Sequence, residues 1–175
     1  MSNIDDFKAK LSGGGARANQ FKVICNFPAF AQGDTELASF MIKGAQLPSD
    51  AIPPIEVPFR GGKKLKIPGD RTVEPMTLTV INDVSMDIRN AFERWMNYIT
   101  AHKQNAGASN ITEFMTDMTI QQLDKNENVV KSYDLIGCWP SNVAAIDLNF
   151  DTTDAIEEFT VEVSYNYWTA STTDS

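Results

Sequence analysis

The chain has 175 residues, of which 42% are hydrophobic and 22% are charged, and its formal net charge is −8. This length and balance are typical of one folded domain with its own core, and they exclude a disordered or fibrous chain. No apolar run approaches the roughly 18 residues of a membrane span, and the start, MSNIDDFKAKL, is acidic where a secretory signal is basic. We expect a protein that stays inside the cell that makes it and has no membrane partner.

The charges are unevenly distributed along the chain. No Lys or Arg follows Lys131, and eight of the 23 carboxylates lie beyond it, at Asp134, Asp147, Asp151, Asp154, Glu157, Glu158, Glu162 and Asp174. Five basic side chains fall within a dozen residues, at Arg60, Lys63, Lys64, Lys66 and Arg71. The ordinary interpretation of the acidic part is a solvated surface, and the asymmetry also suits charge-complementary contacts between subunits.

The first 19 residues predict a mobile N-terminal arm. A short amphipathic piece with Ile4, Phe7 and Leu11 precedes three consecutive glycines, which are too flexible to continue a helix. From Gln20 the apolar residues recur at every second position, as in a half-buried strand. A second strand is predicted from Ser39 to Ala45.

The stretch from Leu47 to Asp70 predicts a hairpin that projects from the domain, at about residues 53–68. Five prolines surround the sequence Arg-Gly-Gly-Lys at residues 60–63. Gly-Gly between extended runs is a hairpin signal, and proline confines such runs to edge or protruding positions because it cannot donate a ladder hydrogen bond. A central strand follows from Met76 to Ile81 and ends at Asn82-Asp83.

One amphipathic helix is predicted at about residues 83–103, capped by Asp83 or Ser85. Its apolar stripe recurs at intervals of three and four residues and comprises Ile88, Ala91, Phe92, Trp95, Met96 and Ile99. A surface loop over residues 104–108 should end it.

The last third of the chain predicts more strands. Two runs, Phe114–Leu123 and Val129–Ile136, flank a polar connector of hairpin length, and strict alternation marks residues 146–151 and 158–167. Together these patterns predict a mainly β fold, a two-sheet β-sandwich or barrel with one flanking helix. The domain should span residues 20–168, followed by a flexible tail at 169–175.

Residues that could carry chemistry are few. No phosphate-binding loop, zinc motif or nucleophile elbow occurs, so we expect no enzyme, no cofactor and no metal. Cys25 and Cys138 have the apolar surroundings of buried free thiols. His102, the one histidine, has no visible partner and should be solvated. A carboxylate hydrolase stays open, because Asp147, Asp151, Glu158 and Glu162 could supply an acid pair, although surface charge fits their alternating positions better.

Two blocks of short motifs carry a family resemblance. The first runs from Gly69-Asp70-Arg71-Thr72 through the central strand and Asn82-Asp83 to a helix with Phe92 and Trp95. The second comprises GCWPSNV at residues 137–143 and the ending FTVEV through Tyr167-Trp168. In this order, between about Asn19 and Trp168, they resemble the tail tube proteins of contractile-tailed, T4-type bacteriophages.

The resemblance implies a structural subunit that forms hexameric rings, stacked into a tube around a channel for viral DNA. It further implies a surrounding tail sheath protein, baseplate and tape-measure proteins as partners, assembly in the host cytoplasm and a final place in the virion. Two alternatives remain: a tube protein of a related contractile injection system, and a small-ligand-binding β-barrel.

The residues suggest two assembly surfaces under this hypothesis. Edges of sheets are satisfied when copies pair around a closed ring, and the projecting hairpin could contact the next ring through Arg60, Lys63, Lys64 and Lys66. Residues 69–71 below the hairpin could be a simple connector or a fixed hinge, while Trp139 and Trp168 should pack within the fold.

The acidic C-terminal residues form the second hypothetical surface. If residues 147–151 and 158–162 lie on adjacent antiparallel strands, the carboxylates of Asp147, Asp151, Glu158 and Glu162 share one face. Because carboxylates do not retain phosphates, this face is predicted to line the channel, the alternative being that it faces the sheath.

Overall fold

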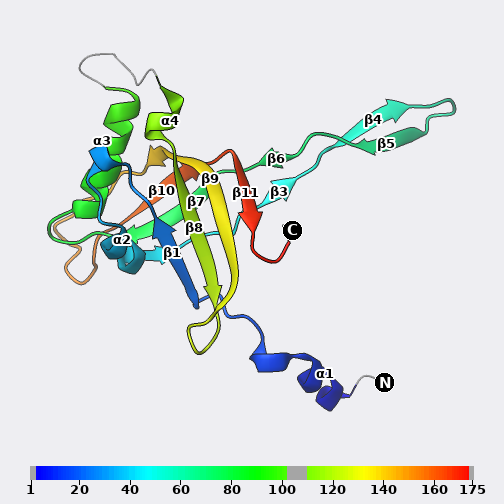
Figure 1. The fold of residues 1–175 in the computed structure, drawn as a ribbon, viewed down its shortest axis with the longest axis horizontal. Helices are drawn as coiled ribbons and strands as arrows, with labels where there is room; N and C mark the ends of the chain where they lie inside the picture. The colour runs from blue at the N-terminus through cyan, green and yellow to red at the C-terminus, as the bar shows by residue number, and fades with distance from the viewer. Residues whose placement is uncertain (1–2, 102–109, 174–175) are drawn as a thin grey trace.

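The computed structural model of the protein describes residues 3–101 and 110–173. Within them, seven antiparallel strands form one nearly closed, barrel-like sheet in the order β1-β8-β9-β10-β7-β2, with β11 also paired to β9 (Figure 1). The strands are β1 Phe21–Cys25, β2 Ile42–Gly44, β7 Met76–Ile81, β8 Thr116–Leu123, β9 Val129–Val143, β10 Glu158–Ser164 and β11 Tyr167–Ala170.

The long strand β9 joins the two halves of the sheet. Its first part pairs with β8 and β11, and its last part pairs with β10. Between them, Gly137 has a φ of +72°, and a Cβ there would lie 2.3 Å from the Asn166 side chain. The Gly-Cys-Trp-Pro motif therefore marks the bend at which β9 passes from one half to the other. The predicted mainly β, two-sheet sandwich or barrel is confirmed, the two sheets being halves of one continuous sheet.

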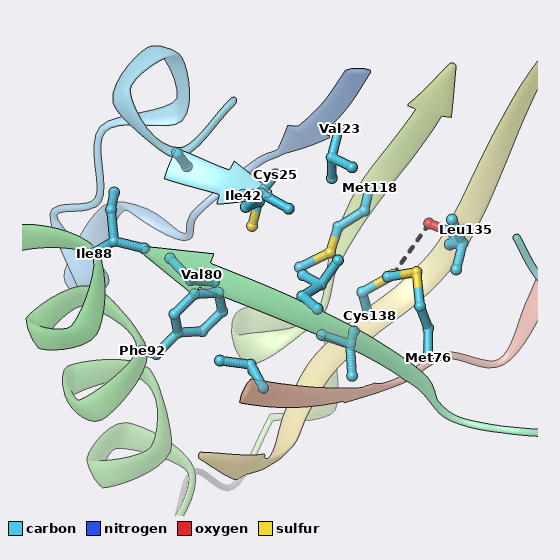
Figure 2. Close-up of a cluster of buried hydrophobic side chains, with 14 of the residues drawn as sticks. Val23, Cys25, Ile42, Met76, Val80, Ile88, Phe92, Met118, Leu135 and Cys138 are labelled. Atoms are coloured by element: carbon cyan, nitrogen blue, oxygen red, sulfur yellow. Dashed lines mark hydrogen bonds between the residues drawn. The ribbon is translucent and has the colours of Figure 1, made fainter. Parts of the chain in front are cut away.

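The core fills the space inside the barrel and under helix α3. Strand β7 buries every second residue, and so does β10. Figure 2 shows side chains from β1, β7, β8, β9 and α3 meeting in one cluster. Leu78, Val80 and Val161 are fully buried, so the interior is packed with side chains.

Helix α3 (Asp87–Ile99) confirms the predicted amphipathic helix and its stripe. Ile88, Ala91, Phe92 and Trp95 are buried, and the Trp95 Nε1 donates to the Phe114 carbonyl oxygen at 2.7 Å. The Asp83 carboxylate accepts from the Asp87 backbone N–H at 3.1 Å, so Asp83 satisfies one free donor of the first turn. His102 and the predicted loop at 104–108 lie outside the described residues.

The predicted strand over residues 39–45 is wrong in its first half. Helix α2 occupies Thr35–Met41, and only Ile42–Gly44 forms strand β2. The Asp34 side chain accepts hydrogen bonds from the backbone N–H groups of Glu36 and Leu37, which caps the helix. A capped turn that buries Ala38 outweighs the weak alternation of this segment.

The predicted strand over residues 146–151 is also wrong. Residues 144–157, all of them described, contain no strand. Both edges of β10 are already paired, one with β7 and the other with β9. The Asp151 N–H donates to Asn149 Oδ1 at 3.0 Å and the Thr152 N–H to the Asn149 carbonyl at 3.2 Å, so the chain turns here. An alternating pattern without a partner strand does not make a strand.

The remaining elements are short. They are α1 Ile4–Lys10, η1 Ser12–Gly14, η2 Ala29–Ala31, α4 Ile111–Phe114, and the strand pairs β3 Asp50–Ala51 with β6 Thr72–Val73 and β4 Pro54–Pro58 with β5 Lys64–Pro68. Helix α1 buries none of its side chains. Strand β11 runs to Ala170, two residues into the predicted flexible tail. In the part of the chain that the structure describes, no helix has the length and apolarity to cross a membrane.

Candidate assembly interface

The β4–β5 hairpin is exposed along both of its strands. It extends away from the barrel at one end of the long axis, as Figure 1 shows in cyan and green. Every residue of β4 and β5 is exposed. Gly61 and Gly62 have positive φ angles in the connecting turn, which suits glycine. The prediction of a projecting hairpin at about residues 53–68 is confirmed.

The two faces of the hairpin differ in polarity. In the β4–β5 pairing, Ile55 lies opposite Ile67 and Val57 opposite Leu65, whereas Glu56 lies opposite Lys66. Since successive side chains of a strand point to opposite faces, the four aliphatic residues share one face. They are 42–59% exposed, and Phe59 at the start of the turn is 72% exposed. This apolar face was not predicted from the sequence, although the alternation in IEV and LKI indicates it.

The four predicted contact residues take two different positions on the hairpin. Arg60 and Lys63 lie in the turn, and Lys64 and Lys66 lie on β5. The Lys64 ammonium forms an ion pair with Glu56 at 2.6 Å. An exposed pair of this kind adds little stability. Among the described residues, Arg60 and Lys63 in the turn and Lys66 on β5 form no ion pair. Their contact role stays a prediction.

A compact cluster fixes the base of the hairpin to the barrel. The Trp168 Nε1 donates to Asp50 Oδ1 at 2.8 Å, and Asp50 also forms an ion pair with Arg71. The Arg71 guanidinium lies over the Trp168 ring, 5.6 Å from its centroid. At Gly69 a Cβ would come within 2.5 Å of the Pro53 carbonyl oxygen, so the two segments that enter and leave the hairpin approach closely there. The Gly-Asp-Arg-Thr motif is therefore part of an anchored base, which favours a fixed hinge over a simple connector.

The four acidic residues proposed for the channel do not lie on one hairpin. Glu158 and Glu162 are on the exposed side of β10, and Asp147 and Asp151 are in the irregular segment before it. Because residues 147–151 pair with no strand, the shared face expected from adjacent strands does not exist. The Glu158 carboxylate forms an ion pair with Lys43, so Glu162 is the freer of the two charges on β10.

The outward side of β10 and β7 is a polar sheet surface. On β10 the exposed positions are Glu158, Thr160 and Glu162, and Thr77 and Thr79 are the corresponding half-buried positions of β7. Antiparallel pairing places Thr160 opposite Thr79 and Glu162 opposite Thr77. No lysine or arginine interrupts β7 or β10 themselves.

Other residues noted in the sequence are structural. Trp139 and Trp168 both pack against the core, and Trp168 meets Tyr133 edge to face at 5.5 Å. Cys25 and Cys138 are buried free thiols, as predicted, and burial raises the pKa of Cys138 to about 12. Across residues 3–101 and 110–173, no group of three or more His, Cys, Asp or Glu side chains could hold a metal ion.

The barrel interior is filled with side chains, and the hairpin leaves an apolar face in solvent. A two-stranded hairpin on its own is at best marginally stable in water, and a contiguous exposed apolar face commonly marks a contact surface. The chain belongs to the phage tail tube protein family, whose sequence profile it matches over residues 16–171.

Named relatives support this family assignment. The tail tube protein of Serratia phage KSP90 is 31% identical over 169 residues, covering 94% of this chain and 95% of that protein. Tail tube protein gp19 of Enterobacteria phage T4 is 29% identical over 167 residues, covering 94% of this chain and 98% of that protein. Proteins of this family are virion components, and the T4-type resemblance predicted from the sequence is confirmed.

Solved structures share the fold at low sequence identity. The tube terminating cap of the anti-feeding prophage aligns with a TM-score of 0.65 at 18% identity, covering 89% of this chain and 90% of that one. A chain of the sheath–tube complex of an extracellular contractile injection system aligns with a TM-score of 0.63 at 14% identity, covering 93% and 95%. At this identity the likeness concerns the fold alone.

Proposed function

We propose that this protein is the structural subunit of the inner tube of a contractile phage tail, and that it assembles into hexameric rings stacked around a channel for viral DNA. The observation that carries the proposal is the anchored β4–β5 hairpin with its exposed apolar face, in a chain of the tail tube family. Burying that face between copies would remove a cost that the isolated chain bears.

The proposed partners follow the same assignment. A tail sheath protein surrounds the tube, baseplate and tape-measure proteins contact it, and viral DNA passes without sequence-specific contact. Assembly takes place in the host cytoplasm before the tube becomes part of the virion. The proposed role is structural and needs no enzymatic activity. A solved sheath–tube complex with the same fold supports the sheath as a partner.

The polar surface of β7 and β10 is the proposed channel wall. A wall with carboxylates such as Glu162 and with few cations would not hold the phosphates of passing DNA. In phage carrying Thr160→Lys and Glu162→Lys, tubes should assemble but deliver DNA poorly, and high salt should relieve the defect. Asn97→Lys with Glu127→Lys adds the same charge at exposed positions of α3 and the β8–β9 turn. Equal DNA delivery by both variants would contradict the channel assignment.

A tube protein of a contractile injection system is the second candidate, because solved chains of such systems share this fold. The β-barrel carrier considered from the sequence is not supported, since the barrel interior is occupied by residues such as Leu78 and Val161. Particles can be purified from producing cells and then triggered to eject. DNA inside the tubes at that stage would favour the phage tail, and its consistent absence would favour an injection system.

Oligomeric state tests the proposal directly. Concentrated protein, with or without purified baseplates, should form rings or tubes in negative-stain microscopy, and light scattering after size exclusion should detect the rings. A chain that stays monomeric at millimolar concentration and ignores added baseplates would contradict the proposal.

A further inference from the structure

A second exposed apolar surface lies at the end of the molecule opposite the hairpin (Figure 1). It comprises residues 82–86 and 144–157, which we name the acidic end. Its apolar side chains are among the most exposed of the described residues: Val84 104%, Leu148 80%, Phe150 105% and Ile156 72%. Side chains of this size, gathered in one region, mark a surface that meets a partner.

Hydrogen bonds hold the acidic end in shape. The Asn82 N–H donates to the Glu157 carbonyl at 2.9 Å, and the Asn82 side chain donates to the Glu157 carboxylate at 3.1 Å, which joins the two segments. Arg89 of α3 donates to the Ala144 carbonyl at 3.1 Å, and the Ala144 N–H donates to the Thr160 carbonyl at 2.9 Å. The exposed side chains are therefore presented by a backbone that is tied to β7, β10 and α3.

A hollow of about 410 Å³ opens in this surface. Ile146, Leu148 and Ile156 are among its apolar lining residues, and Asp147, Glu157 and Glu158 also line it. The lining of the hollow is more polar than apolar, so its carboxylates suit the cations of a partner, and its aliphatic side chains can contact an apolar group that these cations flank.

The charge of the acidic end has one sign. It carries five carboxylates, at Asp83, Asp147, Asp151, Asp154 and Glu157, and no lysine or arginine. Among the described residues, no hydrogen bond or ion pair involves the carboxylates of Asp147, Asp151 or Asp154. These three charges remain available to a partner.

The β4–β5 hairpin has the complementary chemistry. Its turn places the exposed ring of Phe59 next to the cations of Arg60 and Lys63, and its aliphatic face adjoins them. We propose that the hairpin tip of one copy docks on the acidic end of the next copy in the stacked tube. Phe59 enters the hollow, and Arg60 and Lys63 face Asp147 and Asp151. This inference rests on the proposed function and names the surface that receives the hairpin.

The placement of the two surfaces explains why such a contact would propagate. A contact between two different surfaces of the same chain is heterologous, and it continues from copy to copy unless the rotation closes a ring. The hairpin and the acidic end lie at opposite ends of the long axis, so each copy can donate one and receive the other (Figure 1). Apolar burial would supply affinity, and the opposite charges would fix partner and orientation.

Charge reversal on each surface tests the pairing. Arg60→Glu with Lys63→Glu, or Asp147→Lys with Asp151→Lys, should each raise the protein concentration needed for tube growth by about tenfold or more, because like charges then meet. The four substitutions together restore opposite charges and should restore growth. Lys64 and Glu158 are left unchanged because they have partners within the chain. As a matched control, Glu127→Lys in the β8–β9 turn should leave growth unchanged while Asp151→Lys impairs it.

Cross-linking checks the contact without relying on growth. Phe59→Cys with Leu148→Cys should give ladders of disulfide-linked chains in preformed tubes, whereas Phe59→Cys with Val130→Cys should not. The native thiols of Cys25 and Cys138 are buried and do not interfere. If the wild-type chain forms no rings or tubes, the proposed function fails. If wild-type tubes form but the charge-reversed variants grow normally, or the first cysteine pair gives no ladder, this docking is wrong and the proposed function stands.

Discussion

The barrel and the β4–β5 hairpin use the same kind of strand for opposite purposes. Strand β10 alternates exposed and buried residues and hides Phe159, Val161 and Val163 in the core. Strand β4 alternates in the same way, yet Ile55 and Val57 stay in solvent. Alternation therefore determines which residues share a face of a strand, and the neighbouring elements determine whether that face is buried. The barrel buries its apolar face within one chain, whereas the apolar face of the hairpin is left for the proposed contact with a second copy.

The largest expected effect on stability is in the core. Trp95 is fully buried, donates to the Phe114 carbonyl and packs edge to face with Phe27 at 6.1 Å. Trp95→Ala should lower the free energy of unfolding by about 3–5 kcal/mol, measured by urea denaturation of the unassembled chain. Asn97→Ala, at an exposed position of the same helix, is the control. A similar small loss in both variants would show that α3 does not close the core.

The base of the hairpin should give an intermediate effect. Asp50→Ala leaves the Trp168 N–H and the Arg71 guanidinium without their acceptor, which should cost about 1–3 kcal/mol. It should also speed hydrogen exchange of β3 and β6. The control is Asp70→Ala, at an exposed carboxylate next to Arg71 in the chain. Equal stability and exchange in the two variants would mean that the hairpin is not anchored by this cluster.

The buried thiols predict a loss of stability at alkaline pH. Burial raises the pKa of Cys138 to about 12 from a usual 9.0, so above pH 9 the unfolded thiol ionises while the folded thiol keeps its proton. Above this pH the unfolded state binds fewer protons than the folded state. The free energy of unfolding is therefore unaffected by Cys138 ionisation below pH 9 and falls as the pH rises, by about 1 kcal/mol near pH 9.5. Urea unfolding from pH 7 to about 9.5 should show a shallower decline for Cys138→Ala. Parallel curves would contradict the assignment.

The smallest effect on folding is expected on the apolar face of the hairpin. Val57→Ser with Leu65→Ser should change the free energy of unfolding by no more than about 0.5 kcal/mol, because both side chains are already exposed. The same variant should lose tube assembly. Val130→Ser, at an exposed position of β9, should keep both properties. Normal tubes from the hairpin variant would show that its apolar face is not used.

Much of this fold could be predicted from local pattern. The stripe of α3, the alternation of β7 and the Gly-Gly turn of the hairpin are each encoded within a few residues. The segment 146–151 misled because its alternation has no partner strand, and pairing depends on the rest of the sheet. Asp50, Arg71 and Trp168 meet across more than a hundred residues, so no spacing rule reveals their cluster.

The candidate surfaces were only half visible in the sequence. The basic residues of the hairpin and the acidic residues near the C-terminus stand out by charge. The exposed Phe59, Leu148 and Phe150 do not, because an apolar residue in a sequence is ordinarily assigned to the core. Their exposure becomes visible only when the core is seen to be complete without them.

The most direct test of the account compares hydrogen exchange in the unassembled chain and in assembled tubes. Amides of β7 and β10 should be protected in both states, because the barrel is complete in one chain. Amides of β4, β5 and residues 144–157 should exchange quickly in the free chain and become protected in the tube. Unchanged exchange of the hairpin on assembly would contradict the claim that a second copy covers it.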